Sequence, residues 1–469
     1  ELDGLTYSAA GGAGTYDRLA VTGTTATFTA AGAIAPILRG ISAPANNTLD
    51  PVIGDAFRVV TTANASGVSG AFSTVTDPTS GMPTNTRFDV LYGGNYVDLV
   101  LTPDDLSTFA TAYGIQNMVN AAEAFDGIRP AQGRRGATDK DNFFYGIYGL
   151  TASEMSLALL QSSGEIHAFA LSDARDGWEA GVATVRSASA NGDRNFWIDV
   201  SGADVNVDQD TIGSAYDGSS RDIWVGSDVY ENEYVTLGVG VGVSSSEVST
   251  VNSGSADTDT TSLVAYMRGK YGAFEYDGLF SINKSEIETT RAVALSTGSV
   301  SNTSTSTAKG NVLSGKIGYR HDVKSDTLTG LAWLSGDVSS TKTDTFTEEG
   351  SSVTGLTIAG NSVKSANVGL GYTLNGYIGE GELTGANWSL GASVSEQISR
   401  GMPDVSRTAS LHGANWNVSV PKAGDMTKSL RAGLVIPVED NAGISFNVSV
   451  DKRTGSLSKA ASFGIFAQW

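Results

Sequence analysis

The sequence has no cysteine, only three histidines and no apolar run long enough for a membrane-spanning helix. Without cysteine there is neither a disulfide scaffold nor a cysteine-ligated metal site, and no disulfide can trap the chain while it crosses an oxidising compartment unfolded. A spanning helix needs about twenty apolar residues, so that class is excluded. His167, His321 and His412 lie far apart without motif partners, which favours packed or loop positions over a catalytic role.

Positive charge is also scarce, because 30 Lys and Arg face 50 Asp and Glu, for a net charge of -20. This balance argues against a nucleic-acid partner, whose phosphates attract the opposite charge. Residues 310–316 match a phosphate-binding loop until Ile317 replaces the required Ser or Thr, and residues 238–242 are glycine-rich strand. The acidic clusters 257–259 and 348–349 are expected to be solvated rather than calcium-binding. We predict no cofactor and no metal site.

The last nine residues form one strand with two different faces. Phe463, Ile465, Ala467 and Trp469 share an apolar face, and small or polar residues alternate with them, except at Phe466. An apolar strand that ends on an aromatic residue would invite aggregation at the edge of a soluble sheet. It suits the closing strand of a barrel whose outer face touches lipid, with the aromatic side chain at the membrane interface.

The same alternation recurs about twelve times between Asn195 and the C-terminus, for example in residues 235–243 and 388–394. The other face carries Gly, Ser, Arg and Lys, which fill a wet lumen well and a dry core badly. We therefore predict an all-β fold, in which residues 191–469 form a 12-stranded antiparallel transmembrane β-barrel. The predicted lumen charges are Arg268, Lys270, Lys316, Arg320 and Arg431.

The connections between these strands alternate in length. Short turns are predicted near residues 231–233, 271–272, 321–326 and 439–442. Long Ser/Thr/Asp/Gly loops are predicted at 208–220, 288–307, 340–360 and 400–426, with 405–420 as an optional extra strand pair. Short turns on one side and long loops on the other are typical of outer-membrane barrels. Interfacial aromatics are predicted on the turn side: Tyr230, Tyr234, Tyr271, Phe274, Tyr319, Tyr372 and Trp469.

Two further zones precede the barrel. Residues 1–102 contain short apolar segments separated by turn residues, which fits either a right-handed β-helix or a β-sandwich. Residues 103–190 are predicted to be helical, with starts at Thr102 and Thr151 and a polar loop at 130–142. A third, slender helix is predicted at 172–187, capped by Ser172 and narrow enough to thread a polar lumen.

The charged residues of this slender helix should find partners in the barrel wall. We expect Asp173, Asp176 or Glu179 to pair with the predicted lumen cations, because charges buried in a narrow pore need partners. The pore-helix residues are Asp173, Arg175, Asp176, Trp178 and Glu179. His167 lies two residues from Glu165, which would suit a catalytic base and its orienting carboxylate, but a packed histidine is favoured.

The run Ser-Gly-Glu-Ile-His-Ala at 163–168 resembles the motif that precedes the barrel in monomeric type V autotransporters, and residues 54–60, 70–73 and 83–92 resemble the last rungs of their passenger domains. The resemblance implies a β-helical passenger end that nucleates folding at the cell surface, a pore helix and a translocator barrel. It also implies assembly by the barrel assembly machinery and periplasmic chaperones, in outer-membrane lipid, as a monomer. Phe463, Ile465, Ala467 and Trp469 would be the assembly signal.

The family resemblance leaves several questions open. Any export signal is expected upstream, and the chain is expected to be the C-terminal part of a longer protein. Some members cleave themselves at an Asn in the lumen, but Asn191 alone does not predict that here. Two other functions remain: a diffusion porin with an open lumen, and an outer-membrane enzyme with its active site in the loops. The translocator is favoured, and no enzymatic activity is predicted.

Overall fold

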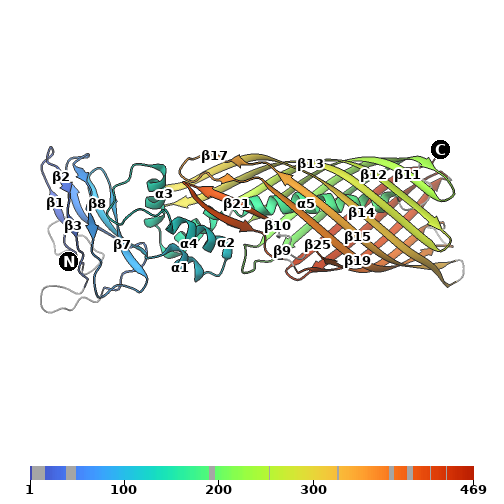
Figure 1. Ribbon diagram of the computed structural model, residues 1–469, viewed down its shortest axis with the longest axis horizontal. Helices are drawn as coiled ribbons and strands as arrows, with labels where there is room; N and C mark the ends of the chain where they lie inside the picture. Colours follow the sequence, from blue (N-terminus) through green and yellow to red (C-terminus); the bar gives the residue numbers. More distant parts are fainter. Residues whose placement is uncertain are drawn as a thin grey trace.

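The computed structural model describes residues 1–2, 16–38, 49–189, 196–252, 254–324, 327–379, 385–398, 405–422, 424–439 and 441–468. Along its length lie an N-terminal β-rich zone, a group of helices and a long barrel with one helix inside (Figure 1). No helix in the described part of the chain is long and apolar enough to cross a membrane.

Twelve strands form the barrel in the described residues, as the sequence predicts. Each pairs antiparallel with the next, and the last pairs with the first, which closes the sheet. The strands are β9 (Phe196–Val207), β10 (Tyr216–Glu231), β11 (Val235–Thr250), β12 (Gly254–Tyr271), β13 (Phe274–Leu295), β14 (Gly298–Lys324), β15 (Leu328–Thr343), β19 (Asn361–Tyr377), β20 (Asn387–Gln397), β23 (Met426–Glu439), β24 (Ala442–Arg453) and β25 (Ser456–Ala467).

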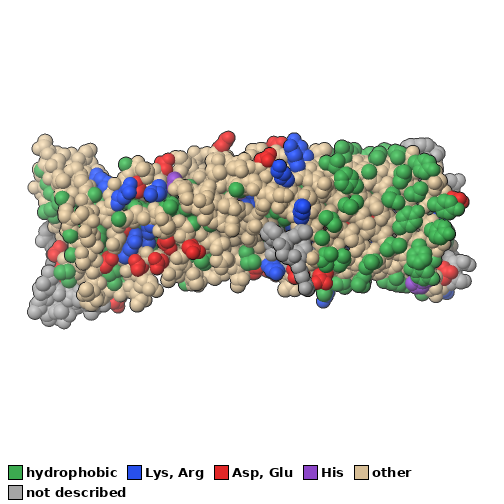
Figure 2. All heavy atoms as spheres, in the orientation of Figure 1, with side chains coloured by type: hydrophobic (Ala, Val, Ile, Leu, Met, Phe, Trp, Pro, Cys, Tyr) green, Lys and Arg blue, Asp and Glu red, His purple; other side chains and the backbone are tan. Residues whose placement is uncertain are grey.

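The barrel turns its apolar face outward. Leu237, Leu390 and Ile465 are 40%, 53% and 51% exposed, and Figure 2 shows such side chains as a belt around the turn-side half of the barrel. This arrangement confirms the predicted orientation, since lipid replaces water around an outer-membrane barrel. Six of the predicted turn-side aromatics are exposed: Tyr230, Tyr234, Tyr271, Phe274, Tyr319 and Tyr372. Trp469 lies outside the described residues.

One predicted long loop is wrong. Residues 288–307 continue β13 and β14 as a paired hairpin that ends between Leu295 and Gly298. The Ser- and Thr-rich composition hid an alternation in which Ile287 and Val293 are buried. Thr and Val also favour strands. The optional strand pair within the last long loop is confirmed as β21 (Ser406–Leu411) and β22 (Ala414–Ser419).

The helices are α1 (Leu106–Thr111), α2 (Gln116–Asp126), α3 (Asp139–Tyr148), α4 (Ala152–Ser163) and α5 (Ile166–Ser189). The predicted helix start at Thr102 is wrong, because Thr102 and Pro103 end β8 and α1 begins at Leu106 with Asp105 as its N-cap. This predicted helix is also divided in two, because Gly114 adopts a left-handed φ of 72°. Part of the predicted loop 130–142 is helical, since Thr138 and Asp141 form a capping box that begins α3. The slender helix begins at Ile166 rather than at residue 172, and Ser172 is buried within it.

Helices α1 to α4 pack against the loop side of the barrel and form a unit that we call the cap. Its core joins Phe125 and Phe144 to Leu295 at the tip of the β13–β14 hairpin, to Leu356 and to Trp416 of β22. Short strands of the long loops complete it: β16 (Phe346–Thr347), β17 (Glu349–Gly350) and β18 (Thr357–Ile358). The cap therefore combines segments that precede α5 with loops that follow it.

The N-terminal zone contains two sets of strands in parallel register. Strands β1 (Leu19–Val21), β2 (Phe28–Ala30) and β3 (Ala33–Ile34) pair parallel with β4 (Ala56–Thr62), β5 (Val68–Gly70) and β6 (Thr74–Val75), respectively. An antiparallel hairpin of β7 (Thr86–Tyr92) and β8 (Tyr96–Pro103) pairs with β4. Phe57, Phe88 and Leu99 form part of the core of this zone.

Candidate functional site: the helix in the barrel lumen

Helix α5 runs through the barrel from the loop side to the turn side (Figure 1). Near its start, His167 contacts Glu348 of the long loop after β15. Near its end, Arg186 donates to Asp277, three residues after β13 begins on the turn side. Strand β9 begins on the same side at Phe196. The chain thus crosses the lumen once, as α5, before it enters the barrel wall.

Trp178 fixes the middle of α5 to the wall. Its side chain is buried, and Nε1 donates a 2.9 Å hydrogen bond to Oγ of Ser285 on β13. The Trp178 ring also packs on Gly310 of β14, where a Cβ atom would lie 2.5 Å from the ring. A wall residue without a side chain therefore makes room for the indole, because atoms in a packed interior cannot approach that closely.

A tryptophan of the wall packs in the reverse direction, against a glycine of the helix. Trp224 of β10 covers Gly181, where a Cβ atom would lie 2.4 Å from its ring, and the indole also covers Gly242 of β11. Helix and wall thus interlock at two levels, Trp178 on Gly310 and Trp224 on Gly181. The predicted slimness of the helix has a packing role, although the two wall contacts were not predicted.

The acidic residues of α5 do not pair with the predicted lumen cations, so that prediction is wrong. Asp173 accepts a 2.5 Å hydrogen bond from Ser246, and Glu179 accepts a 2.9 Å bond from Ser339. Asp176 pairs at 2.8 Å with Arg175 of the same helix. Serine hydroxyls of the wall donate hydrogen bonds to the carboxylates of Asp173 and Glu179. A buried carboxylate needs hydrogen-bond donors, which can be neutral groups as well as cations.

The helix instead supplies a cation to a wall carboxylate. Arg186 and Lys316 both lie near Asp277, at 2.8 Å and 3.5 Å, and Arg186 also donates to Ser314. The charges are thus reversed from those expected: the helix contributes the arginine and the wall contributes the acid. A cation at the C-terminal end of a helix is also favourable toward the helix dipole.

The remaining predicted lumen cations lie on inward-facing positions, away from α5 acids. Arg268 pairs with Asp228 at 2.5 Å, and Arg320 pairs with Glu275 near the turn side. Lys270 and Arg431 form no ion pair with another described residue. Asp228 also accepts from Tyr266 at 2.7 Å, and Tyr266 accepts from buried Trp197 at 3.0 Å. This turn-side network was missed by sequence reasoning, because its members come from three strands.

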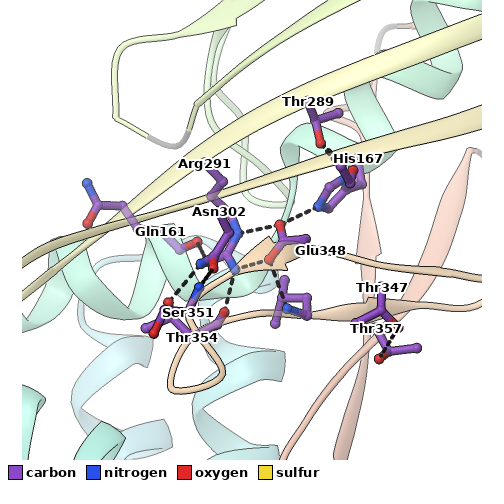
Figure 3. A network of polar contacts seen from close by, with 12 residues as sticks. Gln161, His167, Thr289, Arg291, Asn302, Thr347, Glu348, Ser351, Thr354 and Thr357 are labelled. Atoms are coloured by element: carbon purple, nitrogen blue, oxygen red, sulfur yellow. Dashed lines mark hydrogen bonds and ion pairs between the residues drawn. The ribbon is translucent and has the colours of Figure 1, made fainter.

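A buried ionic cluster joins α5 to the cap on the loop side of the apolar belt (Figure 3). His167 Nε2 lies 2.8 Å from Oε1 of Glu348, and the side chains of both residues have no exposure. Arg291 of β13 donates to both carboxylate oxygens, at 2.9 Å and 2.5 Å, and to the backbone oxygens of Gln161 and Thr354. The cluster links α4, α5, β13 and the loop after β15, and we call it the latch.

The latch corrects one expectation and agrees with another. Glu348 was expected to be a solvated loop acid, yet Arg291 holds its pKa down to about 2 despite burial. His167 pairs with Glu348 and not with Glu165, which accepts from Asn117 and Ser214. Burial lowers the pKa of His167, so its neutral form is favoured. The histidine is packed, as predicted.

Thr289, His167 and Glu348 are arranged like a catalytic triad of hydroxyl, histidine and carboxylate. Thr289 Oγ1 lies 3.4 Å from His167 Nδ1, and His167 Nε2 contacts Glu348. All three residues are buried, and Thr289 also bonds to Ser304 at 2.7 Å. A substrate could not reach this hydroxyl without opening the cap. In the described residues, no group of three or more His, Asp or Glu could hold a metal ion.

The residues of the predicted assembly signal lie at the turn-side end of β25. Phe463 and Ile465 face outward with 39% and 51% exposure, and Phe463 packs against Phe446 of β24 with ring centroids 5.2 Å apart. Ala467 is partly buried and pairs with Phe196, the first residue of β9. The described part of this segment therefore lies where the barrel closes.

Comparison with known proteins places this architecture in a family. No curated protein matches the chain. Among solved structures, the translocator domain of autotransporter NalP from Neisseria meningitidis is similar with a TM-score of 0.50 and 18% identity, covering 66% of this chain and 99% of that one. The transport unit of AIDA-I from Escherichia coli gives a TM-score of 0.44 and 13% identity, over 63% and 99% of the two chains.

A family model supplies stronger information than these distant structures. Residues 196–449 match the family described as "Autotransporter beta-domain", which is more than half of the chain. The matched region starts at the first barrel strand and ends within β24. The chain therefore belongs to the autotransporter β-domain family.

Proposed function

We propose that this chain is the translocator of an autotransporter, that it sits in the bacterial outer membrane, and that it carries its own N-terminal passenger to the cell surface. The observation that carries the proposal is the single crossing of the lumen by α5, together with the family match. The described residues before α5 lie on the loop side, and the barrel wall begins on the turn side. A chain threaded in this way needs a route through or beside the pore.

The route predicts which residues are accessible from outside. In intact cells that express the full chain, added protease should cut within residues 1–102, while the barrel stays intact. The turn-side residues 231–234 should be cut only after the outer membrane is permeabilised. If residues 231–234 were cut in intact cells while residues 1–102 were protected, the barrel would have the opposite orientation in the membrane, and the proposal would be contradicted.

We propose further that residues 1–102 are the C-terminal end of a β-helical passenger and nucleate its folding. Strands β1, β2 and β3 pair in parallel with β4, β5 and β6, so two successive turns of the chain lie side by side around an apolar core, which supports a β-helix over a sandwich. The β7–β8 hairpin covers the end nearest the cap. Deletion of residues 56–92 should leave the upstream passenger protease-sensitive at the cell surface, whereas a resistant passenger would refute the nucleating role.

In the proposed function, α5 closes the pore after export. Trp178, Trp224 and Arg186 fix it at three levels of the lumen. Deletion of residues 172–187 should raise single-channel conductance in planar bilayers. An unchanged conductance would contradict a plug. The same experiment separates this function from a diffusion porin, which the helix-filled lumen does not favour.

Assembly is expected to involve partners that the family resemblance implies. Phe463, Ile465 and Ala467 would present the closing strand to the barrel assembly machinery, after periplasmic chaperones have kept the chain unfolded, and the barrel would act as a monomer. Substitution of Phe463 and Ile465 by Ser should lower the amount of folded barrel in the outer membrane. Substitution of the exposed β13 residues Phe280 and Ile282 by Ser provides a control that removes the same two kinds of apolar side chain away from the closing strand.

A further inference from the structure

The outer face of the barrel carries a row of lysines on the loop side of the apolar belt. Lys284 of β13 lies opposite Lys309 of β14, which lies opposite Lys342 of β15. Lys364 of β19 is diagonal to Lys342, because it pairs with Ser340. All four side chains are exposed. We call these four residues the lysine arc.

The arc begins where the lipid-facing side chains end. On β13, Lys284 follows the exposed Ile282 by two residues, on the same outward face. On β14 and β15, Leu313 and Val338 are the nearest large apolar side chains on that face, four residues from the lysines. Figure 2 shows basic side chains gathered beside the apolar belt on its loop side. The ammonium groups therefore lie at the level where lipid headgroups meet the barrel.

Charge repulsion disfavours three lysines directly opposite one another, although Glu286 lies two residues beyond Lys284 on the same face of β13. The chain has a net charge of -20 and only 12 lysines, yet the four lysines of the arc, a third of the total, lie together on the outer face of four neighbouring strands. Like charges directly opposite in a sheet destabilise it. Lysine often protects the exposed edge of a sheet, but this sheet is closed and has no edge. None of the four lysines forms an ion pair with another described residue.

We propose that the lysine arc binds the phosphate groups of anionic lipid headgroups in the outer leaflet. A lysine ammonium is a compact point charge that suits phosphate. The Cα atoms of directly opposed residues lie about 5 Å apart, so the flexible side chains of neighbouring arc lysines can reach one phosphorylated headgroup together. The arc ends at β12, where Thr261 and Asp259 lie opposite Lys284 and Glu286. The proposal requires the barrel to lie in a membrane and goes beyond its transport function.

The test compares two triple variants of the full chain, folded in neutral detergent. One replaces Lys284, Lys309 and Lys342 by Gln. The matched control replaces Lys140, Lys324 and Lys422 by Gln, which removes the same charge away from the arc. Binding of bisphosphorylated lipid A is measured by native mass spectrometry. The arc variant should bind at least tenfold more weakly than the wild type, and the control should bind within twofold of it.

Further arms keep the proposal falsifiable. Replacement of the same three lysines by Arg should preserve binding, and raising the salt concentration should weaken binding to the wild type. Lipid A without its phosphates should bind like phosphatidylcholine. Equal lipid A binding by the wild type and the arc variant would overturn the proposal. So would displacement of lipid A by inorganic phosphate, since the arc would then bind free phosphate. If the Gln variant fails to fold, the Arg variant and the salt series decide.

Discussion

Nε2 of His167 lies 2.8 Å from Oε1 of Glu348, although 181 residues separate the two in the sequence. His167 belongs to the helix inside the lumen, and Glu348 belongs to the long loop after β15, which is part of the cap. Arg291 of the barrel wall holds the same carboxylate. The cluster therefore ties the lumen helix, the barrel wall and a loop of the cap to one another.

Removing the charge of Glu348 should detach the cap from the barrel. In the variant Glu348→Gln, Arg291 keeps a buried charge without its partner, which typically costs about 3–5 kcal/mol. The cap should become sensitive to protease at a urea concentration that leaves the barrel folded. The adjacent variant Glu349→Gln is the control, because Glu349 is exposed. Equal protease sensitivity of the two variants would contradict the latch.

The latch should weaken in acid. The pKa of His167 is lowered from 6.5, so the unfolded cap binds the extra proton first and stability falls as the pH drops below about 6.5. The pKa of Glu348 is lowered from 4.5 to about 2, so a second loss follows between these values. Cap opening, measured by hydrogen exchange in α4, should increase as the pH falls. In His167→Gln the first of the two losses should disappear.

Two glycines of α5 should respond oppositely to alanine. At Gly181 an added methyl group would meet the ring of Trp224 at 2.4 Å, and such overpacking costs about 1–3 kcal/mol. At Gly177 nothing lies within 4 Å, and alanine gains up to about 1 kcal/mol of helix propensity. Gly181→Ala should thus raise pore conductance, while Gly177→Ala should leave it unchanged. A similar conductance in both variants would show that the helix does not pack closely on Trp224.

Trp416 should determine whether the β21–β22 hairpin stays on the cap. Its side chain is buried against Phe125, with ring centroids 5.0 Å apart, and Nε1 donates a 2.8 Å bond to the oxygen of Ser163. Trp416→Ala should destabilise the cap by about 3–5 kcal/mol. The neighbouring Asn415→Ala removes an exposed side chain and should have little effect. Tryptophan-independent probes, such as hydrogen exchange, compare the two variants.

The barrel could be predicted from the sequence because its signal is local. Within each strand, the alternation of apolar and small residues indicates which side chains face lipid, as for Leu237 and Gly238. The lengths of the connections indicate which end of the barrel carries the short turns and which carries the long loops. The same reasoning failed for residues 288–307, where the buried apolar residues Val293 and Leu295 lie among many serines and threonines. Strand period was present there, but polar composition concealed it.

The contacts inside the lumen could not be predicted, because they depend on which strand lies across from the helix. Asp173 meets Ser246 and Arg186 meets Asp277 only once twelve strands have set their register. From the sequence we could identify the charged residues and infer that they need partners, but we could not predict which residues pair with each other. Glu348 is similar: nothing beside it in the sequence indicates Arg291, which lies 57 residues away.

The core of the cap gives export a direction. Phe125 and Phe144 come from the chain before α5, whereas Leu356 and Trp416 come from loops after it. These side chains can meet only when the segment before the helix has already arrived beside the loops. Once they have met, backward sliding would return a large apolar surface to water. The free energy of packing the cap core therefore opposes return of the chain through the pore. The last stage of secretion needs no nucleotide hydrolysis to be irreversible.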